Sequence, residues 1–218
     1  MKNYNNEKAI ISLTSWKGRI NTVHLTIKNL LKMCPKFHIV LVLSEEEFPL
    51  KEQELPKSLL KLLNKIEILW IYKNYKSFKK TIFTGVKYPN VPIISADDDL
   101  LYKCNYAEIL YNIWLLNKNS VITNDGIDFS CLHICRGPNT LYPPGYLTKL
   151  DKLLNAYETH DLHNEDLFFA VYNKLKFINV IDLKQKSFYD IHSDYTSTVY
   201  YANNIKDEFD VYVKLFPY

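Results

Sequence analysis

Residues 91–99 read VPIISADDD, a short apolar run that ends in three consecutive aspartates. Short continuous runs of apolar, β-branched residues are typical of strands that are buried on both faces. The sequence therefore predicts a strand over 91–96, with Asp97, Asp98 and Asp99 directly after it. In sheets of parallel strands, ligands bind beyond the carboxyl ends of the strands, so this acidic triplet marks the expected place of a site.

Strands and helices alternate over the first hundred residues. The expected order is strand 9–15, helix 22–33, strand 38–44, helix 56–64, strand 66–72 and helix 79–86. Such alternation predicts right-handed βαβ units and a mostly parallel central sheet flanked by helices. We therefore expect an α/β fold of the Rossmann-like kind. Two other strand ends carry polar residues, Thr14-Ser15 and Ser44-Glu45, and should lie at the same edge as the triplet.

The second half of the chain is less regular. It predicts a helix at 106–117, strands at 121–124 and 129–136 joined by a turn at Asp125-Gly126, and a helix at 165–175. Repeats and a Pro/Gly-rich linker are both missing from the sequence, so residues 1–218 are expected to form one domain.

The composition is that of an ordinary globular protein. The chain has 218 residues and a net charge of +3, from 27 basic and 24 acidic side chains. That charge gives no ground for nucleic-acid binding. A signal peptide and an apolar run of about 18 residues are both missing, so we expect a cytoplasmic protein, at most peripheral to a membrane, with reduced cysteines.

The triplet has a specific chemical use. Three adjacent carboxylates repel one another unless a cation or strong donors are present. In an extended backbone Asp97 and Asp99 point to the same side, about 6.6 Å apart, and both could bind one Mg²⁺ or Mn²⁺ ion through oxygen. The alternative is a solvated acidic turn in which Asp98 caps a following helix.

A strand that ends in Asp-x-Asp after several βα units resembles the GT-A glycosyltransferases. Four segments together resemble the bacterial sugar transferases that assemble lipopolysaccharide and capsule: ISLTSWKGRI at 11–20, DDDLLY at 97–102, LYPP at 141–144 and NEDLFF at 164–169. The resemblance implies a GT-A domain with a nucleotide-sugar-binding half at about 1–104 and an acceptor-binding half at about 105–218.

The resemblance also assigns roles on the donor side. A divalent cation, Mn²⁺ or Mg²⁺, would bridge the donor diphosphate and be held by Asp97, Asp99 and His192. The nucleotide would meet Thr14, Ser15, Arg19, Ser44, Lys80, Asp97 and Asp98. Each of these residues also has a non-functional alternative. Arg19 can be a surface residue, Lys79-Lys80 can lie on a solvated helix face, and a lone histidine such as His192 is more often structural.

On the acceptor side the resemblance implies that Asp166 is the general base of an inverting transfer, with Glu165 as the second choice. The alternative is that both acids only complement the helix dipole at the start of the helix. His160 and His163 flank this motif and could contact the acceptor.

The function expected from the resemblance is transfer of a sugar from a nucleotide diphosphate sugar to a hydroxyl of a glycan or lipid-linked glycan, at the inner membrane surface. Residues 212–218 are the segment expected to touch that membrane. Two alternatives are a phosphatase or phosphotransferase with Asp97 as nucleophile and Asp99 as acid, and a non-catalytic sugar- or nucleotide-binding module. Leu101 stands where such phosphatases carry Thr or Val.

The pattern Cys131-x-His133-x-Cys135 is not expected to bind zinc. On a strand, the two cysteines would lie about 13 Å apart, too far to share one ion.

Overall fold

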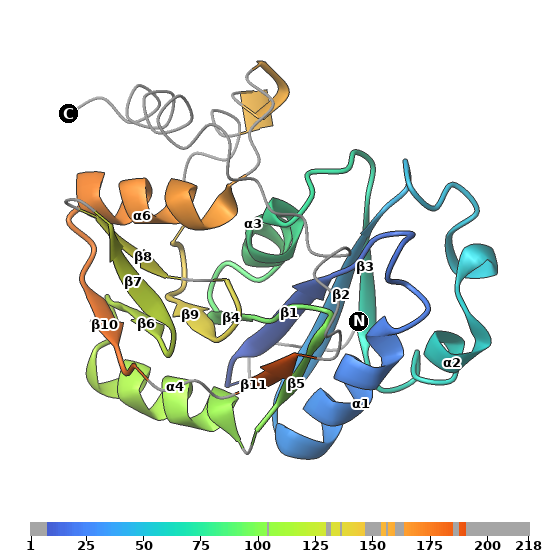
Figure 1. Cartoon of the computed structure of the whole chain (residues 1–218), viewed down its shortest axis with the longest axis horizontal. Helices are drawn as coiled ribbons and strands as arrows, with labels where there is room; N and C mark the ends of the chain where they lie inside the picture. The colour runs from blue at the N-terminus through green and yellow to red at the C-terminus, as the bar shows by residue number, and fades with distance from the viewer. Residues whose placement is uncertain are drawn as a thin grey trace.

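The computed structural model describes residues 8–103, 105–129, 132–135, 137–146, 154–155, 157–159, 164–184 and 188–190. Its centre is a seven-stranded sheet in the order β10-β6-β9-β4-β1-β2-β3 (Figure 1). These strands are β1 (Ile10–Thr14), β2 (His38–Ser44), β3 (Glu67–Ile71), β4 (Ile93–Ser95), β6 (Val121–Thr123), β9 (Thr140–Tyr142) and β10 (Val180–Asp182). The expected α/β class is confirmed.

The sheet is mostly parallel, as predicted. β1 pairs in parallel with β2 and β4, β2 with β3, and β6 with β10. Only β9 runs against its neighbours β4 and β6 in this sheet. β4 therefore lies near the middle, between β1 and β9, and the aspartate triplet leaves the sheet there.

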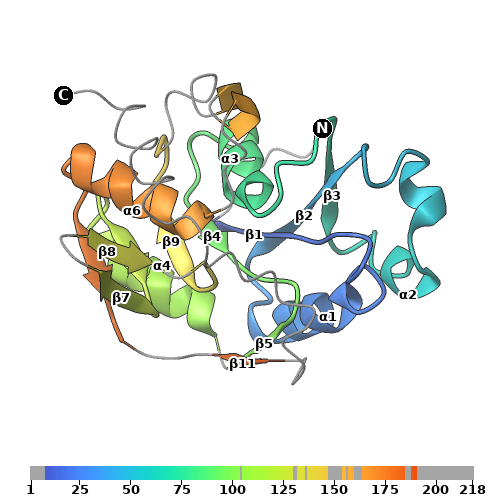
Figure 2. The same cartoon turned by 45° about the horizontal axis from the view of Figure 1, so that its top comes forward.

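Helices cover both faces of the sheet (Figures 1 and 2). One face carries α1 (Val23–Met33) and α4 (Tyr106–Leu116), and the other carries α3 (Phe78–Lys87) and α6 (Glu165–Leu175). Alternate residues of β2 enter the two cores: Ile39, Leu41 and Leu43 face the first, and Val40 and Val42 the second. Burial on both faces explains why this strand is apolar throughout.

Two short antiparallel pairs lie outside the main sheet. β5 (Leu100–Tyr102) pairs with β11 (Phe188–Asp190), and β7 (Gly126–Phe129) pairs with β8 (Leu132–Cys135). The turn predicted at Asp125-Gly126 is therefore wrong, because Gly126 begins β7. A Cβ at position 126 would meet the ring of His133 and the carboxylate of Asp182, so a larger residue there would require these side chains to move.

The predicted helix at 56–64 is shorter than expected. α2 covers Lys57–Leu60, next to the short 3-10 helix η2 (Lys51–Glu54), and hydrogen-bonded turns continue it to residue 66. Throughout the described ranges, no helix has the length and apolar character needed to cross a membrane.

Candidate functional site

The aspartate triplet turns out of β4 into β5 and is fixed through its backbone. The N–H of Asp97 donates to the buried Tyr102 hydroxyl at 2.8 Å. The hydroxyl of Thr26 donates to the carbonyl oxygens of Asp98 at 2.9 Å and Leu100 at 3.0 Å. Two expectations are thereby corrected: the triplet is a turn and not extended, and a strand follows it, so Asp98 caps no helix.

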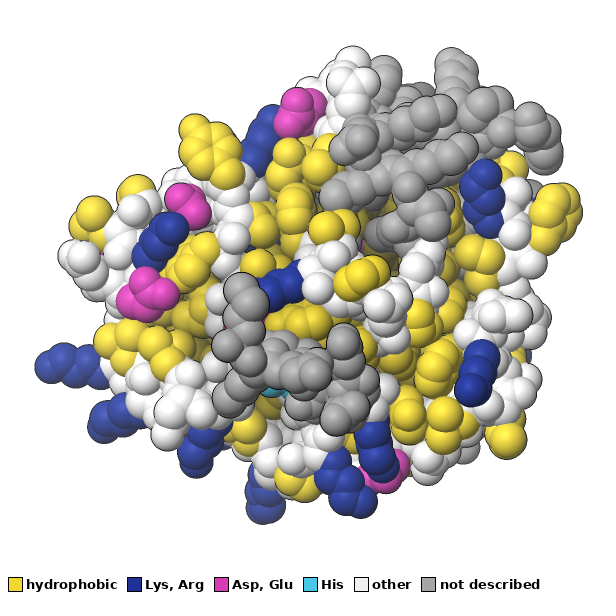
Figure 3. All heavy atoms as spheres, turned by 180° about the vertical axis from the view of Figure 1, so that it is seen from behind, with side chains coloured by type: hydrophobic (Ala, Val, Ile, Leu, Met, Phe, Trp, Pro, Cys, Tyr) yellow, Lys and Arg dark blue, Asp and Glu magenta, His cyan; other side chains and the backbone are white. Residues whose placement is uncertain are grey.

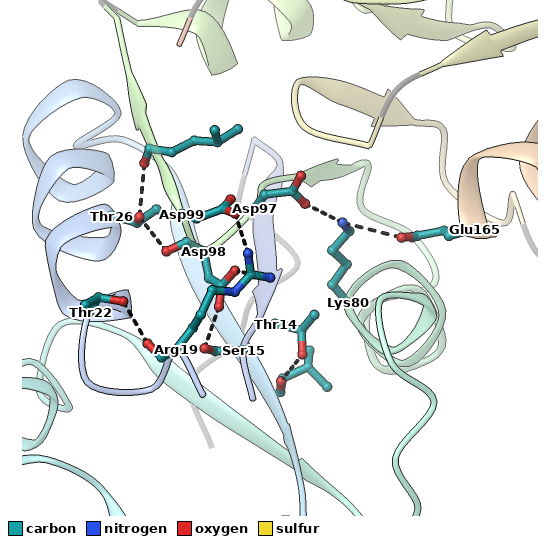
Figure 4. A network of polar contacts seen from close by, with 12 residues as sticks. Thr14, Ser15, Arg19, Thr22, Thr26, Lys80, Asp97, Asp98, Asp99 and Glu165 are labelled. Carbon is teal, nitrogen blue, oxygen red and sulfur yellow. Dashed lines mark hydrogen bonds and ion pairs between the residues drawn. The ribbon is translucent and has the colours of Figure 1, made fainter. Parts of the chain in front are cut away.

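Asp98 points into the protein. Its carboxylate accepts a 2.5 Å hydrogen bond from the Ser15 hydroxyl and lies 2.9 Å from Arg19 Nη2 (Figure 4). Burial raises the pKa of Asp98 to about 6, while Arg19 and Ser15 act in the opposite direction. The hydrogen bond between Ser15 and Asp98 therefore connects the segments that follow β1 and β4.

Asp97 and Asp99 are directed to different cations. Arg19 Nη1 pairs with Asp99 Oδ2, so its guanidinium spans Asp98 and Asp99, while Asp97 faces Lys80 (Figure 4). Burial and the charge of Asp97 raise the pKa of Asp99. The two carboxylates pair with different cations because the chain turns at Asp98 and Asp99 and does not continue as an extended strand.

Lys80 connects the two halves of the chain. Its Nζ lies 2.6 Å from Asp97 Oδ1 and 3.4 Å from Glu165 Oε2, and Thr81 donates to the other Glu165 oxygen at 3.0 Å. The Lys80 side chain is buried. Burial lowers the pKa of Lys80, but the charges of Asp97 and Glu165 outweigh that effect and hold it above the ordinary lysine value.

Helix α6 brings Glu165 and Asp166 into the site through its first turn. Asn164 caps the helix, with its side chain accepting a 2.9 Å bond from the N–H of Leu167. Glu165 is buried, whereas Asp166 is partly exposed. Burial and the neighbouring charge of Glu165 raise the pKa of Asp166 to about 7. The site thus contains a carboxylate whose charge is weakly favoured near neutral pH.

Asp166 lies close to the Asp97–Lys80 pair. A Cβ built on Gly137 would lie 3.3 Å from Asp166 Oδ1, 3.4 Å from Lys80 Nζ and 3.8 Å from Asp97 Oδ1. The Asp97 and Asp166 oxygens are therefore at most 7.1 Å apart, the sum of the first and last of these distances. The structure thus brings the acids after β4 close to those in the first turn of α6. Their roles as cation ligands and general base remain predictions.

Two other predicted residues, and Lys79 next to Lys80, use their polar groups within the fold. The Thr14 hydroxyl donates to the Val42 carbonyl at 2.7 Å, and the buried Ser44 hydroxyl donates to Glu47 at 3.0 Å. Lys79 is buried and pairs with Glu47 at 3.0 Å. The predicted contacts of Thr14, Ser44, Ser15, Arg19 and Lys80 with a nucleotide remain predictions. His192, His160, His163, Cys131 and residues 212–218 lie outside the described residues.

The charge balance of the site favours a further cation. Five carboxylates, those of Asp97, Asp98, Asp99, Glu165 and Asp166, surround two cations, Arg19 and Lys80. Full ionisation would leave three uncompensated negative charges. The side chains of Asp97 and Asp99 keep 32% and 20% of their surface exposed, so these oxygens are accessible.

The residues fit an oxygen-ligated ion such as Mg²⁺ or Mn²⁺, but only as a partial ligand set. Of the side chains that the structure describes, no three His, Cys, Asp or Glu are arranged to hold a metal ion alone. Ions of this kind are commonly bound by one or two carboxylates, with phosphate oxygens and water completing the shell.

Sequence reasoning missed Gly137, Ser95, Thr81 and Tyr102, which orient the predicted side chains. Only Gly137 had a usable signal, because the chain contains just 5 glycines and this one stands after a strand. The other three look like ordinary strand or helix residues.

No protein-family model matches this chain, and a search of curated proteins finds no match either.

Proposed function

We propose that this chain is a metal-dependent glycosyltransferase that moves a sugar from a nucleotide diphosphate sugar to a hydroxyl of a glycan acceptor. The observation that supports this proposal most is that the acids after β4 lie close to the acids in the first turn of α6. Asp97 and Asp99 follow the central strand β4, and Asp166 lies in the first turn of α6, with its Oδ1 at most 7.1 Å from Asp97 Oδ1. That span suits one sugar ring held between a diphosphate and an attacking hydroxyl.

The donor diphosphate needs a cation at this site. A diphosphate is anionic, and the carboxylates already outnumber Arg19 and Lys80. Asp97 and Asp99 would hold Mn²⁺ or Mg²⁺, which would supply charge stabilisation of the leaving diphosphate. Lys80 and Arg19 would fix the directions of these two carboxylates, as groups around metal ligands commonly do.

Asp166 is the better candidate for the base that takes the proton of the acceptor hydroxyl. Both oxygens of Glu165 are engaged, one by Lys80 and one by Thr81. Asp166 is partly exposed, so a substrate hydroxyl could reach its carboxylate. As the acceptor oxygen attacks the anomeric carbon, its proton passes to Asp166 and the bond to the nucleoside diphosphate breaks.

The acceptor class follows from the resemblance to bacterial surface-polysaccharide transferases, and it places the reaction at the cytoplasmic side of the inner membrane. Figure 3 shows basic side chains gathered along the lower edge of the molecule with few acidic ones, on the side where Figure 1 draws α1 and α4. Such an edge favours weak, salt-dependent contact with anionic lipid.

A thermal-shift screen of nucleoside diphosphates, with and without Mn²⁺, tests this proposal, because a ligand of the folded state raises the melting temperature. We expect UDP or GDP to stabilise the chain only with Mn²⁺, and the matching nucleotide sugar to be consumed. Asp128→Asn is the control, since Asp128 is exposed and its carboxylate pairs with His133.

Two results would contradict the glycosyltransferase function and favour one of the alternatives. Phosphate release from simple esters, with no nucleotide binding, would favour an aspartate-nucleophile phosphatase. Nucleotide binding without turnover of any nucleotide sugar would favour a binding module.

A further inference from the structure

Gly137 lies within contact distance of polar side chains from three elements of the site. It is buried, and its α carbon faces three polar atoms that belong to different elements: Asp166 Oδ1 of α6, Lys80 Nζ of α3 and Asp97 Oδ1 after β4. A Cβ there would approach the first two to 3.3 and 3.4 Å, closer than most Cβ contacts allow. No other described glycine has carboxylate and ammonium groups of this site around it.

The backbone of Gly137 is bonded on both sides. Its N–H donates to the Asp166 carboxylate. Its carbonyl accepts from the hydroxyl of Ser95, the last residue of β4. Ser95 stands two residues before Asp97, so one strand end positions Asp97 directly and Asp166 through Gly137.

Space, and not backbone conformation, requires glycine here. Among the described glycines only Gly145 has a positive φ, so Gly137 adopts a backbone conformation that any residue tolerates. The methyl group of an alanine would require Asp166 or Lys80 to move by a few tenths of an ångström.

We infer that Gly137 is a positioning residue: its N–H and its bare α carbon hold the Asp166 carboxylate against the Asp97–Lys80 pair, with one Asp166 oxygen left for the acceptor hydroxyl. The inference rests on the proposed transferase function. It adds that the hydrogen bonds from Ser95 to Gly137 and from Gly137 to Asp166 position the proposed base relative to Asp97, the proposed cation ligand.

The test compares Gly137→Ala with Gly85→Ala. Gly85 lies in α3, and a Cβ there meets nothing within 4 Å, so this variant controls for the glycine-to-alanine change itself. In Gly137→Ala we expect kcat to fall about tenfold, because displacements well below 1 Å already cost rate when reacting groups are misaligned. Donor KM and Mn²⁺-dependent UDP binding should stay within about twofold, since no metal ligand is removed.

A second readout does not depend on turnover. The side-chain carboxyl of Asp166 is titrated by ¹³C NMR in both variants and the wild type, with Glu165, Lys80 and Asp97 as the surrounding charges. Weakening the Gly137 N–H bond disfavours the ionised form, so the Asp166 midpoint should rise in Gly137→Ala and stay unchanged in Gly85→Ala. Ser95→Ala, which removes the bond to the Gly137 carbonyl, should shift it in the same direction.

The outcomes separate the inference from the proposed function. If wild type and Gly85→Ala transfer sugar and Gly137→Ala matches them, with an unchanged Asp166 midpoint, the positioning role is wrong and the transferase stands. If the wild type turns over no nucleotide sugar, the proposed function fails, and the NMR midpoints alone decide whether Gly137 holds Asp166. Should Gly137→Ala not fold, Ser95→Ala tests the same connection: a raised midpoint supports the inference, and an unshifted midpoint overturns it.

Discussion

Lys80 Nζ lies 2.6 Å from Asp97 Oδ1 and ties the first turn of α3 to the carboxyl end of β4. Because Lys80 is buried, removing its charge would leave Asp97 and Glu165 without their cation. Buried ion pairs are costly to break one-sidedly, since the remaining charge stays desolvated.

Lys80→Met should therefore lower the free energy of unfolding by about 3 kcal/mol or more. Lys17→Met is the comparison, because Lys17 is exposed and pairs with Glu54 at 3.6 Å, an interaction expected to contribute about 0.5 kcal/mol or less. Urea unfolding at pH 7 measures both. Equal stability of the two variants would show that the Lys80 pair is not a structural connection.

The three aspartates should separate into a structural and a binding class. Asp98→Ala should destabilise the fold by roughly 1–3 kcal/mol, because it leaves the buried Ser15 hydroxyl without its acceptor and Arg19 without one of its two carboxylates. Asp99→Asn should leave stability nearly unchanged and abolish Mn²⁺-dependent UDP binding. Calorimetry and urea unfolding of both variants check this. Unchanged UDP binding in Asp99→Asn, or in excess chelator, would contradict the cation site.

Away from the site, Glu67 should make stability depend on pH. Burial would raise the pKa of Glu67, but hydrogen bonds from His38, Lys87 and Tyr88 lower it to about 2 from the ordinary 4.5. A depressed carboxyl pKa contributes stability that is complete above pH 4.5 and lost as the pH falls through about 2. Glu67→Gln should be less stable than wild type by roughly 1–2 kcal/mol at pH 7, after allowance for solvent screening, and the difference should shrink below pH 4. A difference that does not change with pH would rule out ionisation as its cause.

Membrane contact is expected on the α1 and α4 side. This side exposes Leu116, with 85% of its surface accessible, and the lysines Lys28, Lys32 and Lys36. Leu116→Glu should weaken binding to phosphatidylglycerol vesicles roughly tenfold, because one buried leucine contributes about 1.5 kcal/mol or more. Phe177→Glu, which alters an equally exposed residue after α6, should bind like the wild type. Co-sedimentation at low salt measures both, and absence of wild-type binding would contradict the expectation.

The strands of the parallel half of the sheet could be predicted from the sequence. The strands β1, β2 and β4 are largely apolar because residues on both of their faces are buried, and such runs can be recognised without knowing the neighbouring strand. The edge strand β3 is mostly half-buried, but its apolar residues 68–71 give a similar signal. The short strands β9 and β10 were not predicted. The reversed direction of β9 depends on its pairing with β4 and β6, which the order of residues does not encode locally.

The site was predictable in its residue types but not in its contacts. Acids at a strand end and at a helix start indicated Asp97, Asp99 and Asp166. That Arg19 would span Asp98 and Asp99 depends on how the loop after β1 folds over the triplet, and charges in a sequence do not reveal their partners. Thr14 and Ser44 were predicted as ligand contacts, yet their hydroxyls have partners within the fold, which any hydroxyl at a strand end can acquire.

Asp166 gives the clearest separation of catalysis from helix capping. If it only complements the helix dipole, Asp166→Asn should cost a few tenths to about 1 kcal/mol. The pKa of Asp166, raised from 3.8 to about 7, implies the opposite sign. A raised carboxyl pKa means that stability falls as the pH rises from 3.8 through about 7. At pH 8 the ionised Asp166 carboxylate therefore destabilises the fold. We expect the free energy of unfolding of Asp166→Asn, measured in urea, to exceed that of wild type by roughly 1–2 kcal/mol.

The same substitution should cost activity. As general base, Asp166 must be ionised, so wild-type transfer should rise as the pH rises through about 7. At pH 8 Asp166→Asn should reduce transfer by roughly 10² or more, and the difference from wild type should shrink below pH 6 as wild-type Asp166 becomes protonated. Mn²⁺-dependent UDP binding should remain, since Asp97 and Asp99 are intact. Glu165→Gln is the matched control: it loses charge in the same helical turn, but its oxygens are engaged by Lys80 and Thr81. A more stable, inactive Asp166→Asn is the result expected of a base, whereas a crippled Glu165→Gln beside an active Asp166→Asn would identify Glu165 as the base instead.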